Sequence, residues 1–173
     1  MHLKISAAVL LVAALVGCDF TEHFTRAYEN SVLRVKKGAN QKGYVEGIDP
    51  GQNVVLEYHH YSSVFPSPGP DAGVSWLEFH IELRPNPITK GNVIEIPSDG
   101  ARAYVAQLFA PHLSSSEATG TVRIVEIRDA GISVQIDLAA KDKFWAQSRT
   151  DTYRYARHSC IGKVDSACEF YAK

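Results

Sequence analysis

The sequence lacks the signatures of the common catalytic sites. It contains no G-x-S-x-G nucleophile elbow, no S-x-x-K, no H-E-x-x-H, no C-x-x-C, no P-loop and no glycine-rich dinucleotide fingerprint. These motifs supply the nucleophile, the metal ligands or the phosphate cradle of most hydrolases and redox enzymes. Their absence favours a non-enzymatic protein, and no cofactor is expected.

An excess of one charge sign is also missing. The 173 residues include 18 Lys and Arg against 19 Asp and Glu, and the stretch 43–140 carries five basic and twelve acidic residues. Nucleic-acid binding depends on a positive surface, so this balance disfavours DNA or RNA as a partner. With 45% hydrophobic and 21% charged residues, the chain has the composition of one globular domain.

No apolar run reaches the roughly 20 residues that cross a bilayer as a helix. The longest, Ile5–Val16, follows Lys4 and has the pattern of a removable secretory signal. It ends in Leu15-Val16-Gly17-Cys18, which resembles the lipobox of bacterial lipoproteins. That resemblance implies cleavage before Cys18, lipidation of Cys18, and a protein held by its lipid in the bacterial cell envelope, facing the periplasm.

This resemblance at the N-terminus and the change of residue pattern farther along the chain divide it into three parts. Residues 1–17 are expected to be the signal peptide, residues 18–42 a lipid-anchored tether with a possible first strand, and residues 43–173 a single β domain. Asp19, directly after the lipidated cysteine, is similar to the residue that favours retention at the inner membrane in enterobacterial lipoproteins. It gives a weak preference for the inner membrane.

Cysteine is scarce, with three residues in the whole chain. Lipidation of Cys18 would leave Cys160 and Cys168 as an even pair in an oxidising compartment. Such a pair is most simply a disulfide, so the sequence predicts a bond between Cys160 and Cys168 that closes a small loop near the C-terminus.

Short alternating runs dominate the sequence after residue 52. In the run Val74–Leu83, Phe79 and Ile81 fall on one face while Glu78 and His80 fall on the other, which is typical of a strand with one dry and one wet face. The pattern predicts an antiparallel β-sandwich, Ig-like or similar, of about seven or eight strands, with a small β-barrel as the alternative. The runs are 53–61, 74–83, 92–96, 102–109, 120–127, 131–138 and 152–158.

One group of side chains could hold a metal ion. Glu57 and His59 share a face of one predicted strand, as Glu78 and His80 do on the next, because residues two apart on a strand point the same way. If these strands pair, the four side chains become neighbours and offer zinc or copper ligands. The alternative is that they form ordinary cross-strand pairs on a solvated face.

The connection between these two strands is the predicted partner-binding edge. It spans residues 62–73, carries three prolines and is flanked by aromatic side chains. Loops of this length are often functional, although the segment could simply cross from one sheet to another. The residues expected to contact a partner are Tyr61, Phe65, Pro66 and Pro68.

Three functions are compatible with these features. The leading prediction is a lipid-anchored, non-enzymatic module that binds another periplasmic or membrane protein, either as an assembly factor or as an inhibitor or immunity-type lipoprotein. The second is a metal-binding or metal-dependent hydrolytic β domain. The third is a small barrel that carries an apolar ligand.

Overall fold

The computed structural model describes residues 20–37, 43–63, 74–86, 88–109 and 112–161, and in these ranges the chain is almost entirely β structure. The single helical element of this part is a 3-10 turn, His158–Cys160. None of its helices has the length and hydrophobicity needed to cross a membrane. The strands are β1 (Phe20–Lys37), β2 (Gly43–Pro50), β3 (Asn53–Ser63), β4 (Val74–Leu83), β5 (Val93–Ile96), β6 (Ala101–Phe109), β7 (His112–Arg128), β8 (Gly131–Ala140) and β9 (Ala146–Tyr155).

The strands form one mixed sheet in the order β2-β1-β3-β4-β6-β7-β8-β9, with β5 added to β7. Every pairing is antiparallel except that of β1 with β9, which is parallel and joins Arg26 to Arg154 and Ala27 to Tyr155. This short pairing makes the sheet ring-like without making it a barrel, so the barrel alternative is wrong. The predicted all-β class is confirmed, with nine described strands. The strand that the sequence pattern missed is β2.

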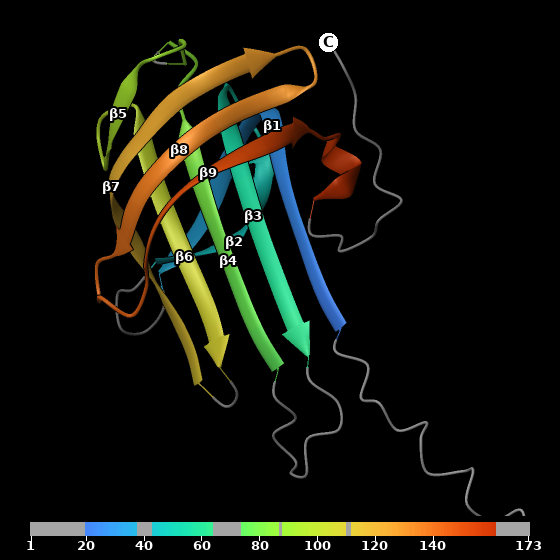
Figure 1. Cartoon of the computed structure of the whole chain (residues 1–173), viewed down its shortest axis with the longest axis vertical. Coiled ribbons are helices and arrows are strands. Elements are labelled where there is room, and N and C mark those ends of the chain that lie inside the picture. The colour runs from blue at the N-terminus through green and yellow to red at the C-terminus, as the bar shows by residue number, and fades with distance from the viewer. Residues whose placement is uncertain (1–19, 38–42, 64–73, 87, 110–111, 162–173) are drawn as a thin grey trace, which may run out of the picture.

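Two layers enclose the main core, as expected of a sandwich. Strands β1, β3, β4 and β6 form one layer, and β7, β8 and β9 curve across it at a steep angle (Figure 1). Between them Tyr58 stacks on Phe79 with 4.5 Å between ring centroids, and Trp145 packs against Phe79 at 5.5 Å. The apolar side chains of the alternating runs thus face one another across the layers. Fully buried members include Leu56, Ile81, Leu83, Val122, Ile124, Val134, Ile136 and Tyr153.

Both long strands bend at a residue with positive φ. In β1 this residue is Asn30, with φ of 50°, and beyond it the strand pairs with β2 through residues 31–37. In β7 it is Gly120, with φ of 139°, which separates the part paired with β6 from the part paired with β5. Such irregularities increase the local twist and redirect a strand. They allow one continuous sheet to supply more than one layer.

The bend in β1 covers the face of β3 and β4 that the sequence pattern predicted to be solvated. Leu33 donates its backbone N–H to Glu82 Oε2 at 2.8 Å and accepts a hydrogen bond at its carbonyl from Arg102 Nη2 at 2.9 Å. A second apolar cluster forms there, so the expectation of one wet face on these strands is wrong. Its buried members are Tyr28, Leu33, Ile48, Val55, Ala156 and Cys160.

Replacing Gly120 with alanine tests the bend in β7. An added Cβ would collide with the carbonyl oxygen of Asp137 in addition to straining a positive φ. We expect Gly120→Ala to lower the free energy of unfolding by roughly 2–4 kcal/mol, measured by urea denaturation. Gly91→Ala is the matched control, because Gly91 also has positive φ but an added Cβ meets no atom within 4 Å. An equal loss in both variants would show that the close approach of β8 is unimportant.

Candidate functional site

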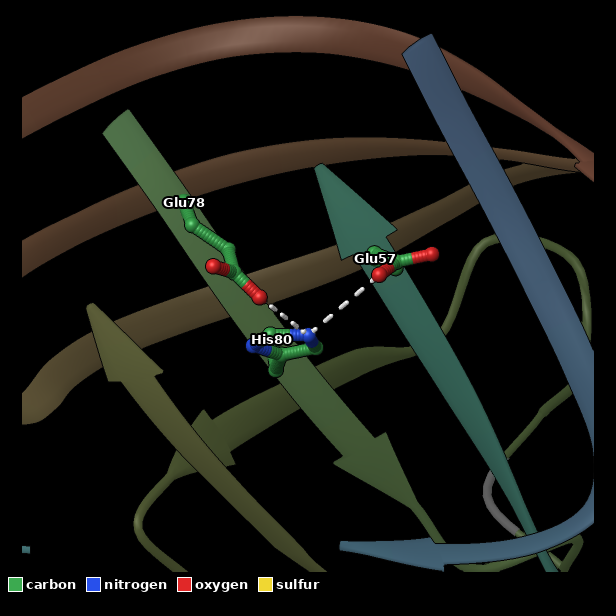
Figure 2. A group of neighbouring side chains, drawn as sticks. All are labelled: Glu57, Glu78 and His80. Atoms are coloured by element: carbon green, nitrogen blue, oxygen red, sulfur yellow. Dashed lines mark ion pairs between the residues drawn. The ribbon is translucent and has the colours of Figure 1, made fainter. Parts of the chain in front are cut away.

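The candidate site is a cluster of charged side chains that the register of β3 and β4 brings together. Glu57 lies opposite His80, and His59 lies opposite Glu78. His80 Nε2 is 3.0 Å from Glu78 Oε1 and 3.7 Å from Glu57 Oε1, so one imidazole nitrogen faces both carboxylates (Figure 2). Glu57 and His80 are both buried.

Strand β1 supplies two further members of the cluster. The Tyr28 hydroxyl donates a hydrogen bond of 2.7 Å to Glu57 Oε2. Arg26 lies opposite Glu57 in the β1–β3 register, and its Nη1 donates to the carbonyl oxygen of Cys160 at 3.0 Å. The carboxylates of Glu57 and Glu78 are therefore balanced by the guanidinium of Arg26 and a protonated His80. A buried cluster of this kind is stable only when its charges are paired in this way.

The pKa values follow from this arrangement. Burial alone lowers the pKa of His80, but the close carboxylates of Glu57 and Glu78 and their negative charges outweigh burial and raise that pKa to about 9. Burial raises the pKa of Glu57, yet His80, the Tyr28 hydroxyl and the charge of Arg26 bring it below the ordinary value. Burial is the main cause that raises the pKa of Tyr28, and the negative charge of Glu57 is the second. At neutral pH the cluster therefore contains ionised Glu57 and protonated His80.

An apolar pocket of about 170 Å³ opens beside the cluster. Glu78 and His80 line it together with aromatic and aliphatic side chains from β2, β4, β6 and β7. The side chains of His80 and Glu78 are 6% and 24% exposed, whereas Leu113 is 66% exposed, so His80 lies deepest and Leu113 lies at the rim. The main wall residues are Tyr44, Val45, Trp76, Tyr104, Ala106 and Leu113.

The structure brings together three of the four predicted metal ligands. Among the described residues, Glu57, Glu78 and His80 form a group whose potential ligand atoms all lie within 4.8 Å of one another. His59 is outside this group: its ring stacks on Phe24, with 4.9 Å between centroids, and contacts Trp76 edge-on at 6.3 Å. The arrangement that the residues adopt is an ion-pair cluster on a buried face.

Tyr61 is the predicted partner residue that the structure places near the pocket. It lies directly opposite Trp76 in the β3–β4 register, and Trp76 is a wall of the pocket. Phe65, Pro66 and Pro68 lie outside the described residues. The partner-binding edge as a whole therefore stays a prediction.

The processing and disulfide assignments also stay predictions. The lipobox, Cys18 and Asp19 precede the described residues, and Cys168 follows them. Cys160 is buried in the second apolar cluster, at the end of the 3-10 turn.

No protein-family model, curated protein or solved structure matches this chain.

Sequence reasoning missed the residues that complete this site. Trp76 could have been found, because it continues the same alternation as Glu78 and His80. The contributions of Arg26 and Tyr28 could not, because they depend on β1 pairing with β3 across the chain. Neither residue carries a local signal of that pairing.

The raised pKa of His80 makes stability depend on pH. Its value of about 9 in the folded protein lies above the ordinary 6.5, so His80 stabilises the fold fully below pH 6.5 and loses this contribution as the pH rises through 9. We expect the free energy of unfolding to fall by an amount on the order of 3 kcal/mol at most over this interval, measured by urea denaturation.

The matched variants for this measurement are His80→Gln and His60→Gln. Loss of the imidazole at position 80 should flatten the pH dependence, whereas His60→Gln should preserve it, because His60 lies on the same strand as Glu57 but outside the cluster. An NMR titration of His80 in the unmodified protein gives the pKa directly. A value at or below 6.5 would refute the ion-pair assignment.

Proposed function

We propose that this protein is a lipid-anchored, non-enzymatic binding module that recognises another protein of the bacterial cell envelope. The observation that carries the proposal is the open apolar pocket, whose lining includes the paired charges of Glu78 and His80. Concave apolar sites with a few fixed polar groups are typical of recognition. The aromatic walls Trp76, Tyr44 and Tyr104 are the kind of residue that contributes most to binding energy.

The state of the cluster favours recognition over catalysis. A general acid or base works best when its pKa lies near the operating pH. The pKa of His80 is raised to about 9 and that of Glu57 is lowered, so both groups keep their charge at neutral pH. Their charges are compensated within the cluster, which supports a fixed dipole at the pocket floor rather than a proton-transfer site.

The course of β1 supports a position for the pocket relative to the membrane. Phe20 begins β1 opposite Ser63 at the end of β3, and Tyr61 and Trp76 lie near that same end. Cys18 precedes Phe20 by two residues, a reach of roughly 7 Å. A lipid on Cys18 would hold this end toward the bilayer, so the proposed partner is a protein at or near the membrane surface. The inner membrane is proposed from Asp19 alone.

Affinity capture of the full chain from its native cells tests the proposal. We expect one protein to be retained by the unmodified chain and lost with Trp76→Ala, because that change removes a pocket wall. Ile127→Ala is the matched control, since Ile127 is an exposed apolar residue on β7 that does not line the pocket. The intact mass of the mature chain should correspond to a start at an acylated Cys18. Equal retention by all three chains would contradict pocket-mediated recognition.

A metal site is the second candidate, favoured by the convergence of Glu57, Glu78 and His80. The same atoms already neutralise one another, so we expect isothermal titration of the tag-free protein with zinc to give no stoichiometric binding. Zinc bound at one equivalent with release of a proton, and lost in Glu78→Gln, would establish a metal site instead, because a ligand nitrogen must be deprotonated.

A further inference from the structure

We propose that the pocket beside the ion-pair cluster receives one uncharged aromatic ring that carries a hydroxyl group, supplied by a tyrosine side chain of the partner protein. This inference rests on the proposed function and names the group that the module recognises. The residues that carry it are Trp76, Glu78, His80 and Leu113, all of which line the pocket.

The size of the pocket fits one six-membered ring with a small substituent. Its volume is about 170 Å³. An apolar cavity of about 150 Å³ is known to bind benzene, which sets the scale for a single ring. The aromatic walls Tyr44, Trp76 and Tyr104 favour an aromatic occupant, because paired rings gain energy beyond the area that they bury.

The floor of the pocket fits a hydroxyl group. His80 Nε2 faces the two carboxylates, whereas the second ring nitrogen lies on the opposite edge of the imidazole (Figure 2). One oxygen of Glu78 points toward His80, and the other points away from it (Figure 2). Within the part of the chain that the structure describes, His80 forms ion pairs with Glu57 and Glu78 alone, and Glu78 with His80 alone, so a nitrogen and a carboxylate oxygen remain for a ligand. A hydroxyl both donates and accepts, so it can donate to Glu78 and pair with the free nitrogen of His80.

The charge of the cluster selects against ionic ligands. Glu57 and Glu78 would repel an anion that enters beside them, and His80 and Arg26 would repel a cation. Because the charges of the cluster cancel, neither ionic class gains a net attraction, and either would lose its hydration in an apolar pocket. An uncharged ring with a polar end loses less hydration energy than an ionic ligand when it enters the pocket.

The rim favours a protein as the source of the ring. Leu113 stands at the rim with 66% of its surface exposed. A small phenolic molecule at the floor would leave that apolar surface in water, whereas the polypeptide that carries a tyrosine would cover it. Aromatic anchors that fill a pocket, with surrounding residues that exclude water, are typical of protein interfaces.

Fluorine NMR of protein labelled with 5-fluorotryptophan provides the test. The chain has two tryptophans, so Trp76 reports on the pocket and buried Trp145 on the main core. We expect p-cresol to shift the Trp76 resonance saturably and to leave Trp145 unchanged. Toluene has the same ring without the hydroxyl and should bind at least about tenfold more weakly, because hydrogen bonds to charged groups are strong. Benzylamine and benzoate should also bind at least about tenfold more weakly than p-cresol.

Two variants in which leucine replaces an alanine test the location of the site. Ala106→Leu fills the pocket without removing a charged group, and we expect it to abolish p-cresol binding. Ala146→Leu makes the same change at an exposed position at the start of β9, and it should bind p-cresol as the unmodified protein does. Binding that survives Ala106→Leu would refute the pocket as the site.

The remaining outcomes separate this inference from the proposed function. Equal affinity for toluene and p-cresol, or tighter binding of either charged ring, would overturn the assignment of a hydroxyl-bearing ring. Binding of p-cresol but not of N-acetyltyrosine methylamide would overturn a tyrosine source in favour of a small phenolic ligand. A captured partner that depends on Trp76, combined with no p-cresol binding, would leave the proposed function intact and refute this inference alone.

Discussion

The charged cluster of Glu57, His80 and Glu78, with Arg26 opposite Glu57 on the neighbouring strand, imposes the constraint on which the rest of the structure depends. A carboxylate removed from water, as that of Glu57 is, is tolerated only beside compensating positive charges and hydrogen-bond donors. Arg26 and Tyr28 on β1 and His80 on β4 supply these groups around Glu57 on β3, so the cluster joins three strands. The pairing of these strands is therefore specified by charge as well as by apolar packing, since slipping one strand past another would separate opposite charges.

This constraint explains the shapes of the two long strands. The polar face of β3 and β4 needs a cover that also supplies hydrogen bonds, and the end of β1 beyond Asn30 does so through the backbone of Leu33. The opposite face needs an apolar cover, and the bend of β7 at Gly120 brings β7, β8 and β9 across it. One continuous sheet can thus bury both faces of its central strands. Hydrogen-bonding groups cover the polar face, and apolar side chains cover the apolar face.

The pocket depends on the same cluster. Glu78 and His80 are held by one another and by Glu57, so the polar groups at the pocket floor keep one orientation. Recognition benefits from such preorganisation, because little conformational freedom is lost when a ligand binds. A group that is fixed in this way and charged at neutral pH serves as a template for hydrogen bonding. It is less suited to the exchange of protons that catalysis requires.

The sequence by itself determined the all-β class, the alternation in β4 and β8, and the grouping of Glu57, Glu78 and His80, because period-two patterning and strand adjacency are local properties. Only the tertiary structure decided that the polar face is buried, that His59 packs against aromatic rings, and that Arg26 and Tyr28 complete the charge balance. These features depend on β1 bending and pairing with distant strands. A strand pattern states which side chains share a face, but what covers that face is set by pairing between residues far apart in the chain.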